Sequence, residues 1–208
     1  MKILVACEYS ARVRDAFRAK GHDAWSCDLR ECEGDPQWHL QCDVMTVLDQ
    51  GWDMMIGHPY CTFNTLAGIR WMYHPDDTAL QPSERRRHPE YPGRMNDFLE
   101  GAAFFNKLMG APIPLICLEN SQPHGLAMSV IGRYTQKVQP WMFGDAFTKG
   151  ACLWLKGLPK LVATHSKVDY ENIEAACHNA SPGEEREKER SRTYLAIAQA
   201  MADQWGDL

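Results

Sequence analysis

Short apolar runs alternate with amphipathic stretches along the chain. Four apolar runs predict buried strands, at residues 2–6, 23–29, 53–56 and 113–118. Apolar residues at helical spacing predict helices over residues 10–21 and 96–109, with Ser10 as the N-cap and Gly21 as the left-handed C-terminal residue of the first. Asp43 precedes a further short helical stretch that extends to Leu48. This alternation favours an α/β fold with a mostly parallel central sheet and flanking helices.

Two segments interrupt the alternation. Residues 69–94 hold four prolines and several arginines, which exclude a long strand and predict an inserted loop of about 69–95. Ser181-Pro182-Gly183 and the charged run 184–190 predict the solvated start of a helix. A last helix is expected over residues 192–205. Its inward-facing residues would be Leu195, Ala198, Met201, Ala202 and Trp205.

Length and composition limit the class of protein. A chain of 208 residues, 45% of them hydrophobic, is expected to form one domain spanning 1–208. No apolar run approaches the ~20 residues of a membrane span, and the first residues do not form a signal peptide, so we expect a soluble cytoplasmic protein. Eight cysteines without metal-type spacing predict reduced thiols and no structural metal.

Polar residues gather where the predicted strands end. These residues are Glu8, Asp28, Asp43, Cys61, Glu119 and Asn120. Ligands bind at the carboxyl ends of the strands in open parallel sheets, so the cluster predicts a functional site. An acidic residue ending the second strand often binds a ribose hydroxyl. For Asp28 and Asp43, however, a local turn or helix cap is an equally good interpretation.

Two of these residues suggest chemistry of their own. Cys61 follows Gly57-His58-Pro59-Tyr60 in a loop after a strand, where a thiol can be exposed and activated. Glu119 follows a strongly apolar run, so its carboxylate must be paired or have a raised pKa. The remaining cysteines beside apolar runs are interpreted as small packing residues, namely Cys7, Cys27, Cys117 and Cys152.

The order Pro59-Tyr60-Cys61, then Glu119-Asn120, resembles the Pro-Cys and Glu-Asn motifs of the C5-cytosine DNA methyltransferases. The whole chain is similar to the short members of this group in phages and prophages. The resemblance implies the class I S-adenosylmethionine-dependent methyltransferase fold, which is Rossmann-like. It also implies a cofactor site for S-adenosyl-L-methionine formed by Cys7, Glu8, Tyr9, Ser10, Asp28, Leu29, Asp43, Val44, His58 and Pro59.

The resemblance also implies catalytic roles and a substrate, cytosine in DNA. Cys61 would add to C6 of cytosine as a thiolate, which makes C5 nucleophilic. A protonated Glu119 with a raised pKa would contact N3. Asn120 would hold the loop or reach the base, and Lys149 would offset charge on the ring or on phosphate.

The sequence departs from the family pattern at three places. The loop of residues 7–11 lacks the family's glycines, Tyr60 separates Pro59 from Cys61, and little room is left between Lys156 and Arg192 for a target-recognition domain. Two alternatives therefore stay open: a binding protein that kept the fold and lost catalysis, or an enzyme acting on free pyrimidine nucleotide or RNA. A second copy of the chain or another protein would then supply recognition.

The insertion is the candidate nucleic-acid contact. A net charge of −5 gives no general attraction to nucleic acid, but the insertion gathers Arg70, Arg85, Arg86, Arg87 and Arg94 with Trp71, Tyr73 and Tyr91. Because it follows Cys61 closely, it is expected to lie over the mouth of the site. The alternative is a basic surface loop without function.

Overall fold

The computed structural model describes residues 1–174 and 192–208. Its centre is a seven-stranded sheet in the order β3-β2-β1-β4-β5-β7-β6. The strands are β1 (Lys2–Ala6), β2 (Asp23–Asp28), β3 (His39–Gln41), β4 (Met54–Gly57), β5 (Leu115–Asn120), β6 (Gln136–Val138) and β7 (Ala151–Lys156). The first five are parallel, and β7 runs antiparallel to both β5 and β6. The predicted mostly parallel α/β fold is confirmed.

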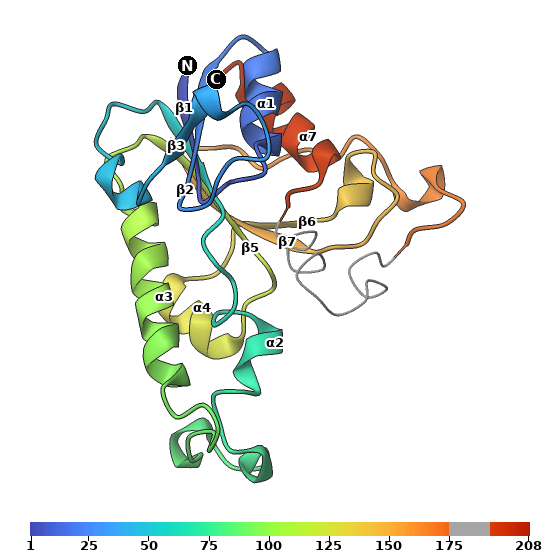
Figure 1. The fold of residues 1–208 in the computed structure, drawn as a ribbon. Helices are drawn as coiled ribbons and strands as arrows, with labels where there is room; N and C mark the ends of the chain where they lie inside the picture. Colours follow the sequence, from blue (N-terminus) through green and yellow to red (C-terminus); the bar gives the residue numbers. More distant parts are fainter. Residues whose placement is uncertain (175–191) are drawn as a thin grey trace.

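Helices cover both faces of the sheet (Figure 1). Helices α1 (Arg12–Ala19) and α7 (Leu195–Trp205) pack on one face, and α3 (Arg94–Met109) and α4 (Gly125–Ile131) pack on the other. Successive residues of a strand point to opposite faces. Ile3 and Val5 of β1 therefore join the α1/α7 layer, whereas Leu4 and Ala6 join the α3/α4 layer. The remaining helix, α2 (Leu66–Ile69), is a single turn.

Several predicted details are confirmed and others are wrong. Asp43 caps the short helix that follows it, and Gly21 has a φ of 85° just beyond α1. Ser10 is not the N-cap of α1, because that position belongs to Ala11. Leu195 was expected to face inward but is 61% exposed, because it is the first residue of α7 and precedes the turn that packs on the sheet.

The insertion contains no long strand, as expected. Single turns of 3-10 helix occur at Pro36–Trp38, Val44–Thr46, Pro75–Asp77, Pro82–Glu84, Pro140–Met142 and Lys167–Asp169.

The helix start predicted at 181–190 lies outside the described residues. No helix in the described part of the chain is long and apolar enough to cross a membrane.

Candidate active site

Two adjacent strands, β4 and β5, bring predicted site residues together. Gly57, the last residue of β4, is in register with Leu118 of β5, so the residues that follow each of them become neighbours. His58 and Glu119 meet in this way although 61 positions separate them. Glu119 and Asn120 belong to β5 itself rather than to a loop after it.

The loop that carries Cys61 is held by hydrogen bonds to its carbonyl groups on both sides of the cysteine. Asn120 Nδ2 donates to the Pro59 carbonyl at 3.1 Å, and the Arg94 guanidinium donates to the Thr62 carbonyl at 3.2 Å. His124 Nε2 lies 3.0 Å from the Phe63 carbonyl. Cys61 itself is exposed. The structure thus presents an accessible thiol on an ordered backbone, as a nucleophile requires.

Tyr60, which separates Pro59 from Cys61, packs against α3 and against Phe63 of its own loop. Its ring stacks on Phe104 of α3 with 5.8 Å between centroids and an interplanar angle of 11°. Gly101 of α3 makes room, because a Cβ there would lie 3.3 Å from the Tyr60 ring. The extra residue therefore attaches the loop to α3.

His58 and Glu119 form a largely buried ion pair. His58 Nδ1 lies 3.2 Å from Glu119 Oε2, and the side chains are only 9% and 21% exposed. Burial by itself lowers the pKa of His58, but the hydrogen bond and charge of Glu119, together with the charge of Glu8, raise it overall. His58 Nε2 is buried and has no hydrogen-bond partner among the described residues.

The expected raised pKa of Glu119 is wrong for this structure. Burial raises the pKa of Glu119, but the hydrogen bond and charge of His58, and then the charge of Lys149, lower it overall. The sequence showed that the carboxylate would be buried but not that it would be paired. Of the two alternatives, pairing and a raised pKa, the structure has the first.

Glu8 caps helix α1. Its two carboxylate oxygens accept from the backbone N–H groups of Val13 at 2.8 Å and Arg14 at 3.2 Å, and the Ser10 hydroxyl donates to it at 3.3 Å. Burial raises the pKa of Glu8, while the charge of His58 and these hydrogen bonds oppose that rise. Ser10 therefore supports the capping carboxylate instead of capping the helix itself.

Two of the predicted cofactor residues, Asp28 and Asp43, lie near Cys7. Asp28 and Asp43 lie close enough to the Cys7 thiol that, after burial, their charges contribute to raising its pKa to about 12. Each carboxylate accepts one local backbone hydrogen bond, Asp28 from Arg30 and Asp43 from Met45. Those bonds are the turn and cap that the sequence also allowed, and they use one oxygen of each carboxylate.

The other expected cofactor contacts differ in accessibility. Leu29 is 74% exposed beside Asp28, which suits an apolar cover for a flat ligand. Tyr9, Val44 and Pro59 are buried, so their side chains serve packing. Cys7 and Ala11 have φ values of 58° and 62°, so the glycine-free loop still follows a left-handed backbone path of the kind that glycine usually supplies.

Lys149 belongs to the same site through its charge. It affects the pKa of both Glu119 and His58, and its Nζ donates to the Arg192 carbonyl at 3.0 Å. Its ammonium group lies 5.4 Å from the centre of the Tyr194 ring. Lys149 thus links the site to the segment that leads into α7.

The arginines of the insertion are largely engaged within the protein. Arg86 pairs with Asp77 at 2.6 Å, and Arg85 and Arg87 donate to backbone carbonyls of the insertion. Arg94 donates to the Cys61 loop. Arg70 is exposed. Figure 1 shows the insertion at the amino-terminal end of α3. That it lies over the mouth of the site stays a prediction.

Comparison with solved structures finds methyltransferases. One is described as a DNA modification methyltransferase encoded within a prophage (E. coli), with a TM-score of 0.42 and 12% identity over 77% of this chain and 51% of that chain. Another is the Entamoeba histolytica methyltransferase EhMeth, with a TM-score of 0.45 and 9% identity over 86% of this chain and 62% of that chain. The chain therefore spans about half to three fifths of these neighbours. No family model and no curated protein matches the sequence.

Sequence reasoning missed two anchors of the Cys61 loop, His124 and the clamping role of Arg94. His124 also caps α4, because its Nδ1 accepts from the Ala127 N–H at 2.9 Å. Its burial lowers its pKa, which agrees with a neutral ring that donates from Nε2. The only signal in the sequence was a polar stretch directly after β5, and it does not reveal which loop that stretch contacts.

Proposed function

We propose that this protein transfers a methyl group from S-adenosylmethionine to C5 of cytosine in DNA through a covalent bond to Cys61. The observation that carries the proposal is the exposed Cys61 on a loop that is fixed by Asn120 and that begins at His58, the partner of the buried Glu119. A thiol for C6 and a protonable carboxyl for N3 are the two groups that this chemistry requires.

The fold and the strand ends support the cofactor assignment. The sheet order, with an antiparallel β7 between β5 and β6, is that of the class I methyltransferases. Asp28, Asp43 and the exposed Leu29 would hold the nucleoside part of S-adenosylmethionine, beside the left-handed backbone at Cys7. When bound, this cofactor supplies an electrophilic methyl group.

The protein's own residues would handle the proton and the electrons. The Cys61 thiolate forms a bond to C6, and charge moves through the ring toward N3. Glu119 and Glu8 raise the pKa of His58, which favours keeping a proton between His58 Nδ1 and Glu119 Oε2. That proton is available to N3 through the Glu119 carboxyl when the base arrives. After C5 takes the methyl group, the C5 proton passes to water, the electron pair of that C–H bond forms the C5–C6 double bond, and the Cys61 thiolate leaves C6 while N3 returns its proton to Glu119.

Trapping with a modified substrate tests the proposal. DNA containing 5-fluorocytosine and labelled S-adenosylmethionine should give a stable adduct, because fluorine does not leave as a proton does. The adduct should map to Cys61 and be absent in Cys61→Ser, whereas Cys32→Ser, a matched variant at a half-buried cysteine, should still form it. An adduct at another residue, or full methylation activity in Cys61→Ser, would overturn the mechanism.

The same assay separates the alternatives. Label in RNA or in free nucleotide, with none in DNA, would keep Cys61 and Glu119 in their roles and change the substrate. No label in any pool, together with no rise in melting temperature at millimolar S-adenosylmethionine, would favour a binding protein without catalysis. A ligand at 100 times its dissociation constant adds about 2.7 kcal/mol of stability, which such a measurement readily detects.

A further inference from the structure

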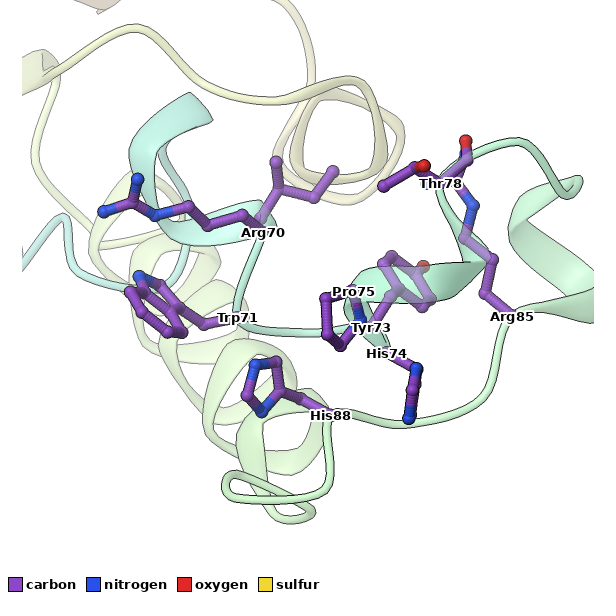
Figure 2. Close-up of a pocket in the computed structure, with 9 residues that line it drawn as sticks. Arg70, Trp71, Tyr73, His74, Pro75, Thr78, Arg85 and His88 are labelled. Atoms are coloured by element: carbon purple, nitrogen blue, oxygen red, sulfur yellow. The ribbon is translucent and has the colours of Figure 1, made fainter.

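The insertion contains a pocket of its own, separate from the Cys61 site. The cavity measures about 410 Å³ and is lined by Ile69, Arg70, Trp71, Tyr73, His74, Pro75, Thr78, Arg85 and His88 (Figure 2). This volume falls within the ~300–1,000 Å³ typical of pockets for small ligands. Cys61 is not among the lining residues, so the catalytic mechanism does not use this pocket.

The pocket is framed by two paired stretches of backbone. Tyr73 and Arg87 form an antiparallel bridge, His74 N–H donates to the Arg86 carbonyl at 2.9 Å, and His88 N–H donates to the Met72 carbonyl at 3.3 Å. Asp77 fastens the end of these two backbone stretches through Arg86, whose hydrogen bonds lower the pKa of Asp77 to about 2. The ion pair of Asp77 and Arg86 is therefore charged throughout the neutral range.

The walls combine aromatic rings with cations. Trp71 and His88 lie 5.6 Å apart between ring centroids. The Arg70 guanidinium is 4.8 Å from the centre of the Trp71 ring, and that of Arg85 is 5.5 Å from the centre of the Tyr73 ring. None of the nine lining residues is acidic. Asp76 is nearby, but its exposed carboxylate pairs with His74 at 3.6 Å.

We infer that this pocket holds a nucleobase by stacking on Trp71, with the phosphate attached to that nucleotide on Arg70. A flat ring suits aromatic walls, and an anionic group suits a rim with arginines and no carboxylate among the lining residues. Thr78 and the imidazoles offer hydrogen-bonding groups for the base edge. The inference rests on the proposed function only for its choice of nucleic acid, because the site is a second one, outside the reacting centre.

The geometry also explains which arginines should matter. Arg70 is exposed and follows α2 directly, whereas Arg86 is committed to Asp77. Arg85 donates to the Leu80 carbonyl at 2.8 Å and the Thr78 carbonyl at 3.0 Å, which fixes its guanidinium at the rim. Binding of the phosphate should therefore depend chiefly on Arg70. Arg85, Arg86 and Arg87 should act mainly by building the pocket.

Binding measurements without methyl donor test the inference. Fluorescence anisotropy with a labelled single-stranded 12-mer DNA should show Trp71→Ala binding about 5- to 140-fold more weakly, the equivalent of the ~1–3 kcal/mol per stacked base. Trp71→Phe should retain most of the affinity. Trp38→Ala is the matched control. The Arg18 guanidinium lies 3.5 Å from the centre of the Trp38 ring, but Trp38 does not line the pocket.

A second variant avoids any effect on folding. Arg70→Glu changes an exposed residue and should weaken binding and flatten its salt dependence by about one unit of slope or more. Arg133→Glu, also exposed, should change neither property as much. Competition with deoxycytidine 5′-monophosphate distinguishes the two sources of the ligand. If submillimolar deoxycytidine 5′-monophosphate displaces the labelled 12-mer, and this displacement requires Trp71, the ligand is a free nucleotide. If only unlabelled 12-mer displaces the labelled 12-mer, the ligand is a strand.

Two results would overturn the inference. One is that Trp71→Ala and Arg70→Glu, both folded, bind the 12-mer as tightly as the wild type does and also bind the mononucleotide as tightly as the wild type does. The other is a loss in Trp38→Ala as large as that in Trp71→Ala. Because neither measurement involves Cys61 or a methyl donor, the pocket and the methyltransferase proposal can fail independently.

Discussion

Replacing His58 by glutamine should remove a pH-dependent part of the protein's stability. The His58 ring joins Glu119 at 3.2 Å in a site where both side chains are mostly buried. Burial lowers the pKa of His58, and Glu119 and then Glu8 reverse the effect, so the folded pKa lies above the ordinary value. The folded pKa of Glu119 lies below its ordinary value, because His58 and then Lys149 outweigh burial.

The signs of these shifts define the pH window. The contribution of His58 is complete below its unfolded pKa of about 6.5 and is lost as pH rises through its raised folded value. The contribution of Glu119 is present above its unfolded pKa of about 4.3 and is lost as pH falls through its lowered folded value. The pair should therefore stabilise the fold most between about pH 4.3 and 6.5.

The size of the effect follows from the kind of contact. A hydrogen bond to a charged group contributes about 1.5–3 kcal/mol. For a domain of this size each kcal/mol shifts Tm by about 2–4 °C, so His58→Gln should lower Tm by about 3–12 °C near pH 6. Above the folded pKa of His58 the loss should shrink, because the imidazole is then neutral and its attraction to the Glu119 carboxylate no longer includes a full positive charge.

Urea unfolding of both proteins at pH 5.5, 7.5 and 9.5 measures this difference. The matched control is His74→Gln, whose partner Asp76 has a side chain that is 79% exposed. Solvent screening should limit that change to about 1 kcal/mol or less. A loss of the same size at pH 9.5 and at pH 5.5 would show that His58 stabilises the site by packing and not by charge.

Three further predictions concern single residues. Cys61→Ala should abolish turnover with little change in Tm. Cys117→Ala, in the core, should lower the free energy of unfolding by about 1 kcal/mol and keep activity. Calorimetry measures the stability of both variants, and a methyl-transfer assay measures their activity. Asn120→Ala should lower kcat with a smaller effect on KM, because it releases the Pro59 carbonyl; steady-state kinetics test this. Iodoacetamide at pH 8 should label Cys61 well before Cys7, whose pKa burial and then Asp28 and Asp43 raise to about 12; peptide mass spectrometry gives the order.

The sequence pattern predicted four strands that have an apolar signal of their own but missed β7, which is also an apolar run. β1, β2, β4 and β5 are runs of four to six residues that become buried against both helical layers. β3 and β6 have three residues each, and these include polar side chains. They become strands because β2 and β7 offer open edges, and an edge depends on tertiary structure that local patterning does not contain.

The proposed catalytic residues could be chosen from motif order, but their electrostatics could not be predicted. Cys61, Glu119 and Asn120 could be chosen because each stands at or near the end of an apolar run. The pairing of Glu119 with His58 depends on β4 and β5 being neighbours in register. A sequence shows that a carboxylate will be buried, which raises its pKa, but the partner that reverses the shift comes from another strand.

The loop of residues 7–11 raises a related question, because it follows a left-handed path without glycine. Ala11 has a φ of 62° and is buried. Its methyl group faces Gly34, in the segment after β2, where a Cβ would lie 2.8 Å from Ala11 Cβ and 2.7 Å from Arg14 Nη2. The small residue that this close approach requires is thus found across from the loop, at Gly34.

A double-mutant cycle tests whether Gly34 makes room for Ala11. Gly34→Ala alone should destabilise the fold by about 1–3 kcal/mol through overpacking. Ala11→Gly alone should change stability by less than about 1 kcal/mol, because relief of the left-handed strain offsets glycine's entropy and one lost methyl group. Combining them should recover at least about 0.5 kcal/mol of the Gly34→Ala loss, since one of the two clashes disappears while that with Arg14 stays. Ala16→Gly, inside α1, is the control and should not rescue Gly34→Ala. Strict additivity of Ala11→Gly and Gly34→Ala in urea unfolding would mean that Gly34 does not accommodate the loop.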